Sequence, residues 1–130
     1  MVLKTNKIVN KFSIPITEPL NEMARISQIK SGLPMIVWLN PDDGTNTGKH
    51  NMPMIKFQDN TNTRIIPKDM IPISIHHTNP TILVKNYTPN LPTSAINQLK
   101  RWIIKNYSIL MDYWNNEIFE DELIATLKSL

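Results

Sequence analysis

The sequence contains no cysteine and no long apolar run, and each absence excludes a class of protein. Without cysteine, the chain has no disulfide framework and no thiolate metal site. No apolar stretch approaches the roughly 18 residues that a membrane-spanning helix needs, and the N-terminus lacks the apolar core of a signal peptide. The sequence therefore predicts a soluble, cytoplasmic protein that does not contact a membrane.

Glycine is also scarce, with only three residues, and the common phosphate-binding loop is excluded. Such a loop has four residues between its glycines, then lysine and a serine or threonine, and it opens a helix. Here three residues separate Gly44 from Gly48, and Lys49 is followed by His50. No glycine-flanked nucleophile occurs either, so the sequence indicates no cofactor and leaves open whether the protein is an enzyme.

Charge is divided unevenly along the chain. The net charge is +3, but residues 1–111 hold 13 of the 14 basic and 6 of the 11 acidic residues, which gives +7. Residues 112–130 hold the other five acids and one lysine, which gives −4. A basic body with an acidic end fits polyanion binding, and it also fits ordinary solvated faces, which are the commoner case.

The distribution of proline in the first two thirds of the chain is typical of short strands and turns. All ten prolines lie between residues 15 and 92. The clearest element is a hairpin with strands at Leu33–Leu39 and Met52–Phe57, joined by the polar loop Asn40–Asn51. Such a long loop is unusual in a compact domain, and this length suggests a functional role.

Further β-prone segments surround this hairpin. Met70–His76 has isoleucine at every second position, while Arg64–Pro67 and Thr81–Lys85 are shorter candidate strands. Pro19–Lys30 fits either a helix that ends at a glycine, or a strand at Arg25–Ile29 paired with the first hairpin strand.

The last third of the chain is helical in pattern. Ser94–Trp114 carries apolar residues at three- and four-residue spacing, which predicts one long helix with Ile103 and Leu110 in the core. A second helix is predicted at about Glu117–Ser129, with acids in its first turns. The predicted fold is therefore α+β: an antiparallel sheet of three to five strands with C-terminal helices on one face, formed by residues 23–130. Residues 1–22 are predicted to be an N-terminal extension that the core does not need.

The three histidines do not predict a metal site. They are His50, His76 and His77, and nearby aspartates are present. Adjacent residues on an extended chain point to opposite faces, so at most one of the His76–His77 pair faces a given site.

Basic residues near the long loop and on the long helix are the candidate binding residues. They are Lys49, His50, Lys56, Arg64, Lys100, Arg101 and Lys105. His50 is the preferred anchor because imidazole titrates near neutral pH and can donate or accept a hydrogen bond. The helix cations lie beside Trp102, which would suit nucleic-acid stacking, but Trp102 lies on the apolar stripe and is more typical of a core residue.

Two stretches resemble the motifs of a known family. His50 to Phe57 is His-Asn-Met-Pro-Met-Ile-Lys-Phe, similar to a His-Asn-Pro-Pro-His-Phe-His-Val strand, and Trp102 to Trp114 matches Trp-hydrophobic-x-x-Asn-x-x-x-Leu-x-x-x-Trp. These motifs belong to a family of small bacterial proteins, domain-of-unknown-function family 4160, and the resemblance covers about Met23–Leu130. The family's two later histidines fall on methionine and Lys56 here, so any chemistry that uses them is not carried over.

The resemblance implies an α+β fold and a role in a two-gene pair of the toxin–antitoxin kind. On this basis we expect a binding module that engages a partner protein or nucleic acid. The alternative is an RNA-cleaving toxin, which would need a proton-transfer group near a cation clamp.

Overall fold

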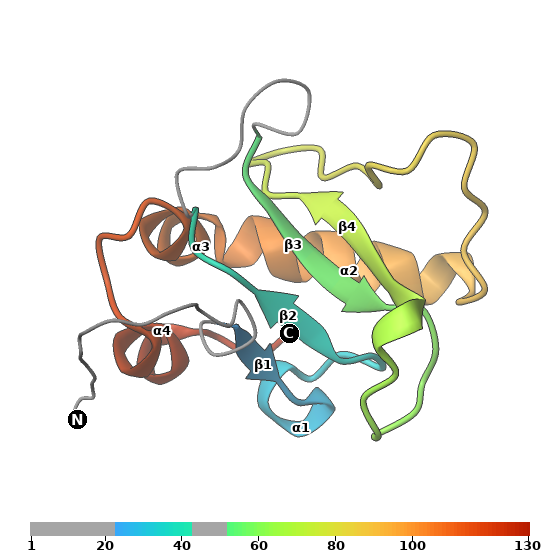
Figure 1. Cartoon of the computed structure of the whole chain (residues 1–130), viewed down its shortest axis with the longest axis horizontal. Coiled ribbons are helices and arrows are strands. Elements are labelled where there is room, and N and C mark those ends of the chain that lie inside the picture. Colours follow the sequence, from blue (N-terminus) through green and yellow to red (C-terminus); the bar gives the residue numbers. More distant parts are fainter. Residues whose placement is uncertain (1–22, 43–51) are drawn as a thin grey trace, which may run out of the picture.

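The computed structural model describes residues 23–42 and 52–130. The predicted extension at residues 1–22 and the loop residues 43–51, which include Lys49 and His50, lie outside the described residues. The strands follow one another in the sheet in chain order, each antiparallel to the next (Figure 1): β1 (Ala24–Ile26), β2 (Val37–Leu39), β3 (Met54–Gln58) and β4 (Met70–Ser74). The helices are α1 (Gln28–Ser31), α2 (Thr93–Lys105), α3 (Tyr107–Trp114) and α4 (Glu120–Thr126), with a 3-10 turn, η3, at Pro67–Asp69. The predicted α+β class is confirmed.

The central hairpin is confirmed, but its strands begin later than the apolar runs suggested. Val37 pairs with Phe57, so β2 and β3 are antiparallel neighbours. β2 starts three residues after Pro34, and β3 starts directly after Pro53. Proline has no backbone N–H to donate to a ladder, so the regular pairing is shortened at that end.

The ambiguous segment before the hairpin contains both predicted elements in short form. β1 pairs with β2, as the strand alternative expected, with Arg25 opposite Trp38. The Ser27 hydroxyl then accepts a hydrogen bond from the Lys30 N–H at 3.1 Å and caps α1. Gly32 ends α1 at a φ of 77°, a left-handed conformation that glycine adopts without strain.

Two predicted strands were wrong. Arg64 lies in a bend, and residues 65–66 lead without regular structure into η3, which begins at Pro67. The Ile66 N–H donates to the Gln58 side chain at 2.8 Å and not to a neighbouring strand. Residues 81–85 contribute one isolated bridge, between Ile82 and Ile73, before the chain turns away at Asn86 with a φ of 61°.

The long helix is broken at Asn106, which the apolar stripe did not predict. The buried Asn106 amide donates to the Trp102 carbonyl and to the Lys128 carbonyl, each at 3.0 Å. Its Oδ1 accepts from the Lys128 N–H at 2.8 Å. The break therefore fixes the C-terminal segment against the α2–α3 junction. α4 is also shorter than predicted and begins after Phe119.

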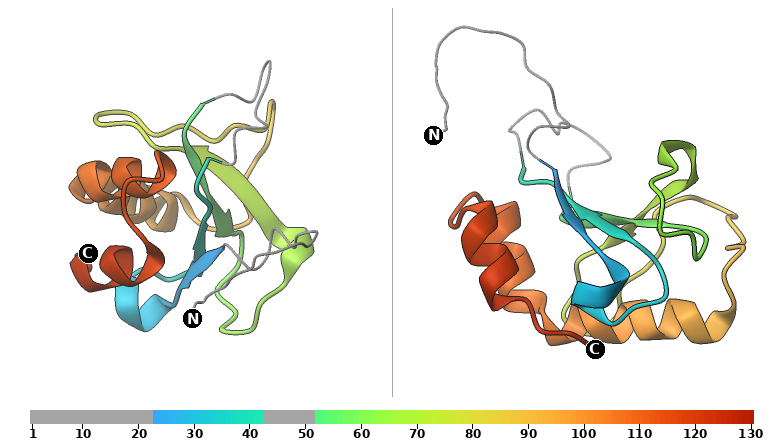
Figure 2. Two further views of the ribbon diagram at one scale, coloured as in Figure 1. Left: turned by 60° about the vertical axis from the view of Figure 1, so that its left-hand side comes forward. Right: turned by 90° about the horizontal axis from the view of Figure 1, so that it is seen from below.

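The core lies between the sheet and the helices. In-register Ile26, Val37 and Phe57 are fully buried on one sheet face. α2 and α3 lie against this face, and neither they nor α4 covers the opposite face, which we call the helix-free face (Figure 2). Only the short α1 borders it. Ile103 and Leu110 are buried in this core, as predicted.

Replacing Ile103 by alanine is expected to lower the free energy of unfolding by about 2–5 kcal/mol, because a fully buried side chain leaves a cavity. The neighbouring Ile104 is 38% exposed and provides the matched control, Ile104→Ala, which we expect to change stability much less. Chemical denaturation of both variants checks this. Equal losses would contradict the packing of α2 described here.

Candidate binding site on the helix-free sheet face

A row of four residues crosses the helix-free face of the sheet. Register places Arg25 opposite Trp38, Trp38 opposite Lys56, and Lys56 opposite Pro72, so all four side chains lie on the same side. Trp38 is only 3% exposed, and its indole Nε1 is buried without a hydrogen-bond partner. A buried donor without a partner is costly, so this row is not an ordinary solvated surface.

Two adjoining hollows open beside this row, with volumes of about 340 and 380 Å³. They share Arg25 and Ile65, and we call them together the groove. Three parts of the chain line it: β1 with α1, the start of β2, and residues 63–70, which we call the wall segment. The lining residues are Met23, Arg25, Ser27, Gln28, Ile29, Ile36, Trp38, Thr63, Ile65, Pro67 and Met70.

Among the described residues the groove lining is largely apolar, and Arg25 is its one charged member. Ile29 lines one hollow and is 95% exposed, an unusual position for a large apolar side chain. An apolar hollow with few polar groups is typical of a binding site.

Gln58 fixes the wall segment in place. Its side chain is 1% exposed, and its Nε2 donates to the Arg64 carbonyl and to Asn60 Oδ1, each at 2.9 Å. Its Oε1 accepts from the Ile66 N–H, and its backbone N–H donates to the Ile36 carbonyl at 2.9 Å. One buried amide therefore determines where the chain turns back over the sheet.

Gln28 links the two sides of the groove near one end. Its Nε2 donates to the carbonyls of Pro34 and Thr61, each at 3.0 Å. This contact ties α1 to the loop that precedes the wall segment. The groove is thus held at a set width by side chains that bond to backbone.

Positive charge predominates around the groove. Arg25, Arg64 and Lys68 are exposed and Lys56 is half-buried, and none of them forms an ion pair in the part of the chain that the structure describes. The wall segment has one carboxylate, Asp69, which accepts a hydrogen bond from the Asn60 side chain at 2.9 Å.

The buried carboxylate of Asp59 is engaged away from the groove. It accepts from the Tyr87 hydroxyl and from the N–H groups of Asn90 and Leu91, at 2.8 and 3.0 Å for the two backbone donors. Desolvation, together with the hydrogen bond to Asp59, raises the pKa of Tyr87 to about 12. The Asp59 charge therefore holds the 87–91 loop and does not neutralise the groove.

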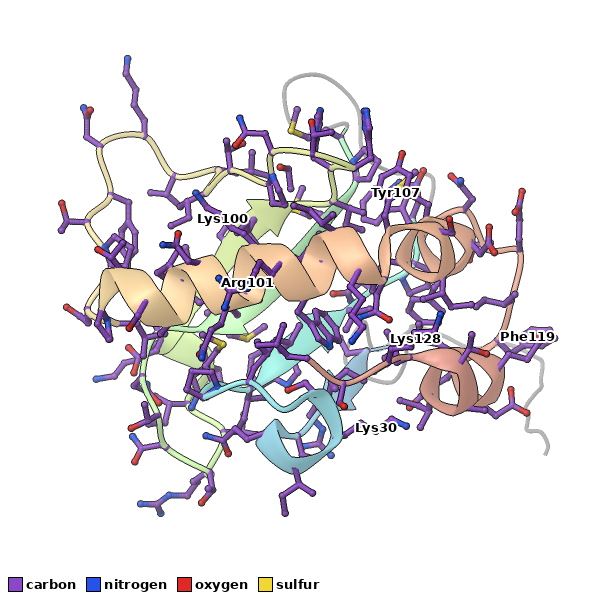
Figure 3. The ribbon with its side chains drawn as sticks, turned by 180° about the vertical axis from the view of Figure 1, so that it is seen from behind. Lys30, Lys100, Arg101, Tyr107, Phe119 and Lys128 are labelled. Atoms are coloured by element: carbon purple, nitrogen blue, oxygen red, sulfur yellow. The ribbon has the colours of Figure 1, made fainter. Side chains whose placement is uncertain are left out.

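The predicted binding residues do not form one site. Lys56 and Arg64 belong to the helix-free side, whereas Lys100 and Arg101 lie on α2, on the opposite side of the molecule (Figure 3). Lys105 is also on α2 and donates to the Ser129 carbonyl at 2.9 Å. Trp102 is buried in the core, as predicted, and offers no stacking surface.

The prediction that His76 and His77 point to opposite faces was wrong. Their rings stack with centroids 4.8 Å apart, and His77 also meets Tyr107 edge-on at 5.7 Å. β4 ends at Ser74, so the alternation of a strand no longer applies. His76 Nδ1 instead accepts from the N–H groups of the next turn. No group of three or more metal-binding side chains occurs among residues 23–42 and 52–130.

Sequence reasoning missed Arg25 and Trp38 as site residues. Trp38 lies in a continuous apolar run, which hides the alternation that would have placed it on the face opposite Val37. The available signal was the single cation Arg25 at the centre of a three-residue strand.

Comparisons with protein families, with curated proteins and with solved structures found no match to this chain. Within the described residues, no helix is both long enough and apolar enough to cross a membrane.

Replacing Gln58 by leucine is expected to release the wall segment, because the Ile66 N–H and the Arg64 carbonyl lose their partner. We expect a loss of about 1–3 kcal/mol in unfolding free energy and faster hydrogen exchange at the Ile66 amide. Gln98→Leu on α2 is the matched control, since the Gln98 side chain makes no hydrogen bond within the described residues. Unchanged exchange at Ile66 in Gln58→Leu would contradict this role.

Proposed function

We propose that this protein is a binding module whose groove takes an acidic, apolar segment of a partner protein. The observation that carries the proposal is Arg25, a cation that two apolar hollows share and that has no ion-pair partner among residues 23–42 and 52–130. A guanidinium forms strong, charge-assisted hydrogen bonds with carboxylates. The hollows on either side can bury the neighbouring apolar side chains of the same segment.

The lining of the groove favours a protein partner over a single-stranded nucleic acid. Proteins that bind single strands present exposed aromatic rings on which bases stack. Trp38 is the only aromatic side chain in the part of the lining that the structure describes, and it is 3% exposed. Isoleucine, methionine and proline make up most of the remaining surface, which suits aliphatic or aromatic side chains of a peptide.

The resemblance to a family found in two-gene pairs is consistent with this proposal and suggests that the partner is encoded nearby. The RNA-cleaving alternative has less support. Cleavage would need a proton-transfer group beside the cations, and the described residues that line the groove include no aspartate, glutamate or histidine.

Fluorescence anisotropy with three dye-labelled probes tests the proposal: an alternating Glu-Leu peptide, an alternating Lys-Leu peptide and an oligouridylate. We expect the Glu-Leu peptide to bind the protein most tightly. Arg25→Glu should raise its Kd about tenfold or more, because a lost charged pair removes about 1.5–3 kcal/mol.

Lys85→Glu is the matched control, since it makes the same charge reversal at an exposed residue that does not line the groove. Its Kd should stay within about threefold of the parent value, as expected for a distant surface charge. Tighter binding of the oligouridylate, or equal effects of the two reversals, would overturn the proposal.

A further inference from the structure

Phe119 is the most conspicuous apolar side chain outside the core, apart from Ile29. It is 79% exposed at the start of α4 and projects from the edge of the molecule (Figure 3). Four exposed acids surround it in sequence: Glu117, Glu120, Asp121 and Glu122. None of these acids forms an ion pair within the described residues.

The position of Phe119 is fixed by its backbone. Its N–H donates to Glu122 Oε1 at 3.2 Å, and its carbonyl accepts from the Leu123 N–H at 3.0 Å. Leu123 is fully buried, so α4 is anchored to the body of the protein. The ring is therefore presented on a rigid element, and a partner that binds it does not have to order a loose segment.

Phe119 and the groove are both apolar at their centres, and the charges that surround them are opposite in sign. One surface is an apolar ring flanked by carboxylates, and the other is an apolar hollow of about 340 Å³ bordered by Arg25. Lys56, Arg64 and Lys68 add positive charge to the same side. The indole Nε1 of Trp38 is buried in this row without a hydrogen-bond partner among the described residues, as is the Nε1 of Trp102 in the core.

We propose that the groove binds the Phe119 segment of a second copy of this chain. The phenyl ring enters the apolar hollow, and the flanking carboxylates pair with Arg25 and its neighbouring cations. This inference rests on the proposed function, since it names the acidic, apolar segment that the groove takes.

The contact joins two copies and not two parts of one copy. Phe119 projects from the edge of the molecule beside α4 (Figure 3), whereas the groove lies beside Trp38 on the helix-free sheet face. Each copy carries one ring and one groove, so a single contact leaves one free ring and one free groove, and association proceeds either to a closed ring of copies or to longer chains of copies. A contact that consists of one ring and a few charged pairs buries a small area and gives weak association, which is observed only at high protein concentration.

Two complementary variants test the inference by sedimentation velocity. Phe119→Ser lacks the ring but keeps the groove, and Arg25→Glu keeps the ring but repels the acids. We expect wild-type protein to form concentration-dependent larger species and each variant alone to be monomeric. An equimolar mixture should form a 1:1 dimer and nothing larger, because only one productive contact remains.

Val84→Ser is the matched control, because Val84 is 39% exposed and does not line the groove. This variant should associate like the wild type. A wild-type protein that is monomeric at every concentration, a Phe119→Ser variant that still associates, or a mixture that stays monomeric would overturn the inference.

The anisotropy assay distinguishes a failure of the self-association inference from a failure of the proposed function. If wild-type protein is monomeric but still binds the Glu-Leu peptide through Arg25, the groove takes another partner and only the self-association is wrong. If the peptide does not bind either, both proposals are wrong.

Discussion

The whole arrangement depends on a sheet that helices cover on one face only. The long helices follow the strands in the chain, and α2 and α3 bury the face that carries Val37 and Phe57. The opposite face, with Trp38 at its centre, has only the segment after β3 to close over it. Gln58 determines how that segment folds back, because its buried amide bonds to three different groups beyond the strand. The groove exists because this cover is partial.

Partial cover also explains the chemistry of the groove. The wall segment hides the indole of Trp38 but supplies no acceptor for its N–H, and it leaves Arg25 without a counter-ion within the described residues. A fold optimised only for stability would satisfy both groups. Local departures of this kind are expected where a surface is kept for binding. The same molecule presents Phe119, an exposed apolar side chain among carboxylates, at the start of α4 (Figure 3). This surface is complementary in charge to the groove.

Much of the fold could be predicted from local patterns, and two of the main errors share one physical cause. Helical spacing placed Ile103 in the core, and two apolar, β-prone runs separated by turn residues placed the central hairpin. The predictions failed where a buried polar side chain accepts a hydrogen bond from a backbone N–H farther along the chain. Gln58 accepts from Ile66 in this way, and Asn106 accepts from Lys128. The candidate site was missed for a related reason: its lining comes from three segments that meet only in the folded chain.

The groove's occupancy by Phe119 of a second copy can be observed directly by NMR. Because the chain has no cysteine, a nitroxide label on Thr126→Cys, an exposed and uncharged residue of α4, sits at one position. Spin-labelled protein that carries no isotope label is mixed with isotope-labelled wild-type protein. The indole N–H signals of the wild-type protein are then followed. The account predicts broadening at Trp38, which lines the groove, and a sharp signal from Trp102 in the helix-side core. Equal broadening at both residues, or none at Trp38, would contradict it.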